Sequence, residues 1–148
     1  MEIIKKYKVL LVLALLVIVA VFFLFSRMFH NDVKELTDFS ASYEIFDKAI
    51  SDFSIGETVD LESKAGDALI ELNQNASARI SSLIKNDGQL MSTALEIADL
   101  SKKELDKLRA YKRAVESNCA DLDGFAKEYG DWTSKRKAAY AHFRSLLD

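Results

Sequence analysis

The hydrophobic pattern of the chain begins with an unbroken apolar run. Residues 9–25, VLLVLALLVIVAVFFLF, contain no charged or strongly polar side chain. A helix over this run measures about 26 Å, and extending it to Phe29 gives the length of a full membrane span. We therefore expect a transmembrane helix over residues 9–29, with residues 1–8 as a stub before it.

A cleaved secretory signal is the main alternative, because it too has basic residues before an apolar core. The core of such a signal usually runs about 7 to 15 residues and ends in a small-x-small cleavage site. The run here is longer and ends in FFLFSR at residues 22–27. We therefore favour an uncleaved signal anchor. A buried helix of a soluble domain is the remaining alternative.

Basic residues beside the run indicate its orientation. Three lysines lie before it, within residues 5–8, whereas Arg27 and Lys34 follow it. Cytosolic flanks of membrane helices carry the excess of Lys and Arg, and the first flank is denser and closer to the run. We expect the N-terminus in the cytosol and residues 30–148 outside it, at the cell (inner) membrane.

After the run, apolar residues recur every three or four positions, as on one face of an α-helix. The first such stripe, from Leu36 to Phe53, predicts a helix over residues 32–54. This helix either begins at a capping box of Asp32 and Glu35 or continues directly from the membrane helix. Its stripe is unbroken along its whole length.

Two further stripes predict two more long helices. The second helix begins near Thr58 and ends at the Asn-Asp-Gly turn sequence of residues 86–88. The third covers about residues 89–123, with Cys119 and Leu122 on its apolar side.

Charged pairs mark the opposite face of the third helix. Asp99 with Lys103, and Lys112 with Glu116, lie four residues apart, where each ion pair is worth a few tenths of a kcal/mol. We interpret this face as solvated.

Two glycines are expected to end the third helix. Gly124 and Gly130 break or bend the chain, and Asp131 or Thr133 then caps a last, short helix. That helix bears the apolar residues Ala139, Phe143, Leu146 and Leu147.

These patterns predict an all-α chain, with a single N-terminal transmembrane helix followed by an antiparallel three- to four-helix bundle over residues 30–148. Short connections make successive helices antiparallel neighbours. Aromatic residues in the first stripe, such as Phe39 and Tyr43, favour a packed bundle. A thin two-stranded coiled coil prefers Leu, Ile and Val at its seam.

Composition and charge narrow the classes of function. The chain of 148 residues has no proline and one cysteine, which excludes an intrachain disulfide framework and a Cys-rich zinc site. Residues 1–29 carry a net charge of +3, so the overall charge of −3 leaves −6 on residues 30–148. An acidic domain gains little from phosphate contacts, and we expect no nucleic-acid partner.

Catalytic and metal-binding patterns are also missing from the sequence. Neither His30 nor His142 has a Glu three positions before it, as the Glu-x-x-His pairs of di-iron bundles require. Phosphate-binding loops, nucleophile elbows and dinucleotide fingerprints do not occur. We therefore expect no enzyme, no cofactor and no metal site.

Two groups of residues have both a structural and a functional interpretation. Cys119 on a helical stripe is expected to pack as a small hydrophobe, and the alternative is a disulfide with a second copy or a partner. Lys135, Arg136 and Lys137 lie near Trp132. For this cluster we favour a solvated face over the edge of an aromatic core.

The leading interpretation is a single-pass membrane protein whose extracytoplasmic bundle binds another protein or further copies of itself. It would act as an adaptor, assembly factor or structural subunit of the cell envelope. The expected interaction surface is formed by Tyr111, Val115 and Leu122 on the third helix, or by the aromatic end at Trp132.

Two alternatives stay open. One is a ligand-sensing domain that resembles the extracytoplasmic helical domains of chemoreceptor-type sensors and would need a partner to transmit its signal. The other is a self-associating coiled-coil spacer. Its N-terminal anchor and helical ectodomain are similar in layout to the inner-membrane component of phage lysis spanins.

Overall fold

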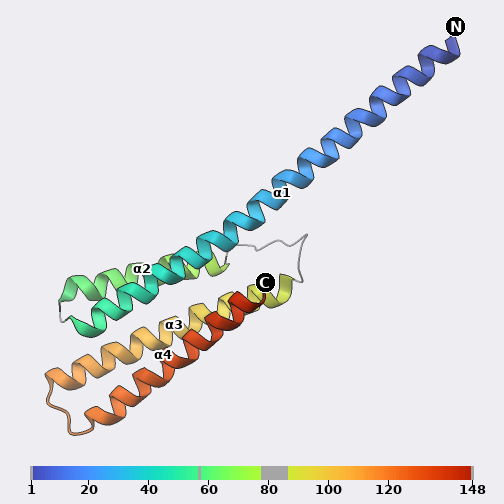
Figure 1. Cartoon of the computed structure of the whole chain (residues 1–148). Helices are drawn as coiled ribbons and strands as arrows, with labels where there is room; N and C mark the ends of the chain where they lie inside the picture. The colour runs from blue at the N-terminus through green and yellow to red at the C-terminus, as the bar shows by residue number, and fades with distance from the viewer. Residues whose placement is uncertain (1, 57, 78–86, 148) are drawn as a thin grey trace.

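The computed structural model describes residues 2–56, 58–77 and 87–147, with side chains from residue 15 onward except at 27–33, 35 and 87. Every regular element within these ranges is a helix, and the predicted all-α class is confirmed for them. The second half of the first helix packs with the others in an antiparallel bundle, and its first half projects beyond them (Figure 1). The helices are α1 (Glu2–Ile55), α2 (Val59–Ser77), α3 (Asp87–Glu116) and α4 (Leu122–Ser145).

The first helix, α1, runs without interruption for 54 residues, about 80 Å at 1.5 Å per residue. Neither Gly nor Pro occurs between Glu2 and Ile55, so no residue there removes a backbone hydrogen bond or favours a turn. The helix therefore continues directly into the bundle instead of beginning anew at Asp32. It ends where the N–H of Gly56 donates to the carbonyl of Asp52 at 2.9 Å.

Among the residues that the structure describes, no helix is both long enough and apolar enough to cross a membrane. Described side chains cover residues 15–26 of the transmembrane segment predicted at 9–29. The remaining side chains of that segment, and those of the stub at 1–8, lie outside the described set.

The bundle closes on itself in chain order. The helices pack as α1 on α2, α2 on α3 and α3 on α4, and aromatic side chains join α4 back to α1. Phe39 of α1 and Phe143 of α4 have ring centroids 4.8 Å apart, and Tyr43 stacks on Tyr140 at 3.5 Å. Four helical segments thus surround one core.

The core is built from the predicted stripes. Every stripe residue of α1 from Phe39 to Phe53 is at most 5% exposed, and full burial of each large apolar side chain stabilises the fold by about 1.5–3 kcal/mol. The second and third helices contribute many alanines, which allow their backbones to approach closely. The buried apolar residues of α2 and α3 are Ala65, Ala68, Leu72, Ala76, Leu90, Ala94, Ile97, Ala98, Leu105, Leu108 and Ala114.

The prediction that the third helix continues to residue 123 is wrong. Helix α3 ends at Glu116, and Asn118 has a left-handed backbone with φ of 51°. The N–H of Cys119 donates to the carbonyl five residues before it at 2.9 Å, and that of Asn118 to the carbonyl three residues before it at 3.1 Å. This pair of bonds is a Schellman motif, which satisfies the last carbonyls of a helix and ends it.

The last helix, α4, is longer than the short helix predicted after Gly130. Its N-cap is Asp121, whose Oδ1 accepts a hydrogen bond from the N–H of Gly124 at 3.1 Å. Gly124 and Gly130 therefore lie inside α4, and the expectation that they break the chain is wrong. An isolated Gly destabilises a helix by only about 0.5–1 kcal/mol relative to Ala, which burial of Phe143 offsets.

Candidate functional site

A groove opens at the end of the bundle farthest from the projecting half of α1. This distal end carries the α1–α2 turn and the α3–α4 connection (Figure 1). The groove has a volume of about 640 Å³ and lies between the end of α1, the start of α2 and the last two turns of α3. We call it the distal groove, and its lining includes Phe53, Ile55, Val59, Tyr111, Arg113 and Val115.

Apolar side chains form part of the lining of the distal groove, beside polar and charged ones. Phe53 is buried beneath it, whereas Ile55 and Val59 are 83% and 84% exposed on the two sides of the α1–α2 turn. Val115 of α3 is 39% exposed. Single exposed apolar residues are ordinary on a protein surface, but several around one groove form a patch that gains from being covered.

Lys112 crosses the groove toward the end of α1. Its Nζ donates to the carbonyl of Gly56 at 2.6 Å and lies 5.1 Å from the centroid of the Phe53 ring. This cation satisfies one of the free carbonyls at a helix C-terminus, where the helix dipole favours positive charge. The predicted ion pair between Lys112 and Glu116 is not among those of the described residues, whereas the predicted pair of Asp99 and Lys103 forms at 2.6 Å.

Two arginines one turn apart on α3 differ in their partners. Arg109 is paired, because its Nε donates to Oε1 of Glu62 at 2.8 Å and its Nη1 lies 3.6 Å from Oδ1 of Asp106. Arg113 donates from Nε to the carbonyl of Arg109 at 3.3 Å, and none of the ion pairs of the described residues includes it. Arg113 is exposed.

The structure brings together only part of the predicted interaction surface. Tyr111 and Val115 both line the distal groove. Leu122 is instead the first residue of α4 and is half-buried, and the prediction that it lies on the third helix is wrong. Trp132 is half-buried on α4, where Nζ of Lys135 lies 4.2 Å from its ring centroid, and it does not line the groove.

The single cysteine also lies off the predicted helix. Cys119 belongs to the α3–α4 connection and is half-buried, because the Schellman motif ends α3 before it. It is therefore not a stripe residue of α3. A disulfide to a second chain stays a prediction.

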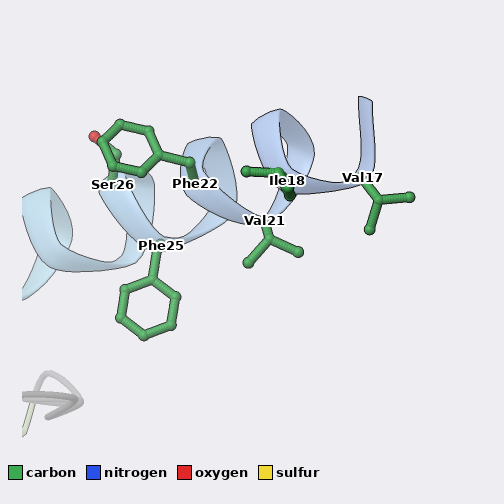
Figure 2. Close-up of a pocket in the computed structure, with 6 residues that line it drawn as sticks. All are labelled: Val17, Ile18, Val21, Phe22, Phe25 and Ser26. Carbon is green, nitrogen blue, oxygen red and sulfur yellow. The ribbon is translucent and has the colours of Figure 1, made fainter. Parts of the chain in front are cut away.

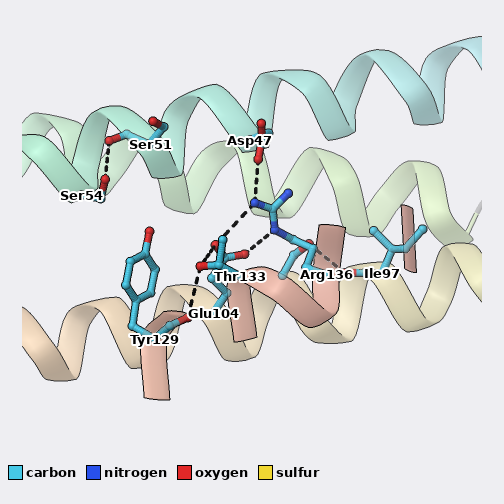
Figure 3. Close-up of polar contacts among 9 residues, drawn as sticks. Asp47, Ser51, Ser54, Ile97, Glu104, Tyr129, Thr133 and Arg136 are labelled. Atoms are coloured by element: carbon cyan, nitrogen blue, oxygen red, sulfur yellow. Dashed lines mark hydrogen bonds and ion pairs between the residues drawn. The ribbon is translucent and has the colours of Figure 1, made fainter. Parts of the chain in front are cut away.

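A buried ionic cluster joins three of the helices (Figure 3). Arg136 of α4 is 1% exposed and Glu104 of α3 is 0% exposed. The guanidinium donates from Nε to Glu104 Oε2, and from Nη2 to Asp47 Oδ1 of α1 at 2.6 Å. Thr133 donates to the other carboxylate oxygen of Glu104 at 2.7 Å. The cluster fixes α4 against both α1 and α3.

The expected solvated face over residues 135–137 is therefore wrong at its central position. Lys135 and Lys137 are exposed, but Arg136 lies in the core between the rings of Tyr43 and Phe46, at 5.1 and 5.3 Å from their centroids. The sequence carries a signal for this placement, because Arg136 has the helical spacing of the buried α4 stripe.

Electrostatic shifts in the core follow from burial and from this cluster. Burial raises the pKa of Tyr43 to about 12, with Asp47 and Glu104 acting in the same direction and Arg136 against it. Burial lowers the pKa of Arg136, but the hydrogen bond and charge of Glu104 outweigh burial and leave it raised. Arg136 Nη1 and Tyr140 Oη are buried with no hydrogen-bond partner among the described residues.

The projecting part of α1 has a different surface. Its large apolar side chains from Leu15 to Phe25 are 53% to 76% exposed. A shallow hollow there is lined by α1 alone, through Val17, Ile18, Val21, Phe22, Phe25 and Ser26, whose side chains project in several directions (Figure 2). No second helix supplies a wall to this hollow within the described chain.

Within the described ranges, no group of three or more His, Cys, Asp or Glu residues is arranged to hold a metal ion. No protein-family model matches the chain, and no curated protein and no solved structure matches it either.

Proposed function

We propose that this chain is a single-pass membrane protein whose helical bundle binds another protein on the extracytoplasmic side of the cell membrane. In this role it is an adaptor or structural subunit of the envelope. The observation that carries the proposal is the exposed apolar surface of α1 from Leu15 to Phe25, on the same helix that enters the bundle core.

Exposure of so large an apolar surface of α1 to water is unfavourable. Ten large apolar residues between Leu15 and Phe25 are exposed, and covering each is worth up to about 1.5–3 kcal/mol. Consecutive residues face all sides of a helix, whereas a partner helix covers only one stripe. A bilayer covers every side at once, and residues 9–29, the apolar run with its extension to Phe29, have the length that a span needs.

The proposed anchor and the bundle share helix α1, so the length of that helix gives the expected distance of the distal groove from the membrane. From Phe29 to Ile55 the helix rises by about 40 Å. The groove is then expected about that far from the membrane, and with the N-terminus in the cytosol, as the lysines before the run favour, it lies on the extracytoplasmic side. A partner in the envelope would be met there.

Burial of the stripes within one chain favours a protein-binding adaptor over an elongated coiled-coil spacer. The α1 stripe from Phe39 to Phe53 is covered by the other helices of the same chain. A spacer that pairs through its stripes would need these residues at a seam between chains.

Extraction of membranes at alkaline pH tests the anchor. We expect the full chain to stay in the pellet and a Val17→Lys/Val21→Lys variant to be released, because each Lys at the centre of a span opposes insertion by about 2.5–3.5 kcal/mol. A Glu44→Lys/Ser51→Lys variant, altered at exposed positions of the bundle part of α1, is the control and stays in the pellet. Release of the unaltered chain would contradict the proposal.

Photo-crosslinking tests the partner. A photoreactive residue at Val115, in the distal groove, is expected to give a discrete adduct heavier than the chain. The same residue at Lys102, exposed elsewhere on α3, is expected to give none. Identical products from both positions, or no product from Val115, would remove the support for a binding site in the groove.

A further inference from the structure

The distal groove combines an apolar floor with cations that have no carboxylate partner. Lys112 is held by a backbone carbonyl and Arg113 by another, so neither charge is neutralised by an acidic side chain in the described structure. Arg109 is already paired with Glu62. Glu116 is the lining carboxylate left to balance the two cations.

This local balance runs against that of the whole domain. Residues 30–148 carry a net charge of −6, yet the described lining of the groove holds three cations against two carboxylates, beside exposed Ile55, Val59 and Val115. Guanidinium and ammonium groups next to an apolar surface bind carboxylates strongly, because charge-assisted hydrogen bonds strengthen when water is excluded.

The size of the groove sets the kind of occupant. A volume of about 640 Å³ is far more than one ion fills and falls in the range of pockets that hold drug-sized ligands, which leaves room for a short stretch of a peptide. Two cations are too few for a nucleic-acid backbone, which needs a row of phosphate contacts. The groove also lies about 40 Å along α1 from the end of the predicted membrane span, away from that membrane's head groups.

We infer that the distal groove binds an acidic segment of a partner protein, one that places a large apolar side chain between the exposed apolar residues of the two rims and carboxylates against Lys112 and Arg113. This inference rests on the protein-binding function proposed above and specifies the chemistry of the partner. Ile55, Val59 and Val115 would close around the apolar side chain, while exposed Arg113 is free to form a bidentate pair.

Two synthetic peptides and a random peptide library, presented to the full chain in lipid nanodiscs, test this inference. The two peptides share a central Phe and differ only in having Glu or Lys at the flanking positions. We expect the Glu peptide to bind and the Lys peptide to bind at least about tenfold more weakly. Peptides enriched from the library are expected to combine Asp or Glu with Phe, Leu or Trp and to compete with the Glu peptide.

Charge reversal provides the matched variants. Arg113→Glu is expected to weaken the Glu peptide by about tenfold or more and to improve binding of the Lys peptide, and Val115→Glu to weaken both. Lys102→Glu makes the same charge change on α3 away from the groove and leaves binding unchanged. Because Arg113 is exposed, its substitution does not disturb the core.

Several results would overturn the inference. These are enrichment of basic or uncharged peptides, equal effects of Arg113→Glu and Lys102→Glu, preferential binding of anionic vesicles over the Glu peptide, or self-association that only the groove variants abolish. A chain that crosslinks at Val115 but does not bind acidic peptides would overturn the inference and leave the proposed function standing. A chain that is released from membranes but still binds the Glu peptide would contradict the membrane anchor and leave the inference on the groove standing.

Discussion

Arg136 joins α4 to both α3 and α1 through ion pairs. Its guanidinium is buried against Glu104, which is itself fully buried, and reaches Asp47 on α1. Removing one member of such a pair leaves an uncompensated charge in the core. Replacing both members with apolar residues of similar size avoids that penalty.

We therefore expect Arg136→Met to lower the free energy of unfolding by about 3–5 kcal/mol. The double variant Arg136→Met/Glu104→Leu is expected to recover most of this loss. Urea titrations of the full chain in nanodiscs, followed by fluorescence of the single Trp132, measure both. A double variant no more stable than the single one would show that the charge pair is not what the substitution disrupts.

Tyr43 predicts how stability depends on alkaline pH. Its pKa is raised by burial from 10.0 to about 12 in the folded chain, so the unfolded chain loses the phenolic proton first. Stability from this group is therefore present below pH 10 and falls as the pH rises toward 12. Tyr43→Phe is expected to show a smaller loss of stability between these pH values. Parallel curves for the two proteins would contradict the expectation.

The buried cluster could be predicted from the sequence only in part. Glu104 lies at core spacing between Ile97, Ser101 and Leu108, so a polar residue within the stripe was visible. The pairing of Glu104 with Arg136 was not visible, because the two residues are 32 positions apart in the chain, although Arg136 has the helical spacing of the buried α4 residues. Only the crossing of α3 with α4 brings them together.

At the scale of elements, the spacing of hydrophobic residues predicted that the helices exist better than it predicted where they begin and end. The stripe from Leu36 to Phe53 gave the bundle part of α1, since its aromatic residues all face one core. The end of α3 was missed because its signal is a single Asn in the left-handed region, and Asn takes that role less often than Gly. The start of α4 was also predicted too late, because Gly124 and Gly130 lower helix stability too little to break it.

The two glycines of α4 offer a matched pair of substitutions. A Cβ at Gly130 meets nothing within 4 Å, whereas one at Gly124 would lie 2.6 Å from the Asp121 carboxylate that caps the helix. Gly130→Ala is expected to stabilise the chain by about 0.5–1 kcal/mol, and Gly124→Ala to give no such gain. The same urea titrations decide this. No stabilisation from Gly130→Ala would argue that α4 begins after that residue.

At the scale of the whole molecule, helix α1 connects the apolar segment in its projecting half with the distal groove at its other end. The sequence predicted an apolar segment and a helical bundle, but it did not decide whether one helix joins them. The groove was beyond sequence reasoning, because its walls come from residues as far apart as Phe53 and Val115. The pattern of the third helix alone indicates Tyr111 and Val115, but it does not indicate the end of α1 and the start of α2 that face them across the groove.

The most direct test of the account uses the chain's single cysteine as a label. Cys119 lies in the α3–α4 connection at the distal end. Energy transfer from a donor there to head-group-labelled lipids, in nanodiscs containing the full chain, measures the height of this end above the bilayer. We predict a height of about 40 Å. A donor within about 20 Å of the head groups, or a chain that does not remain with the nanodiscs, would contradict it.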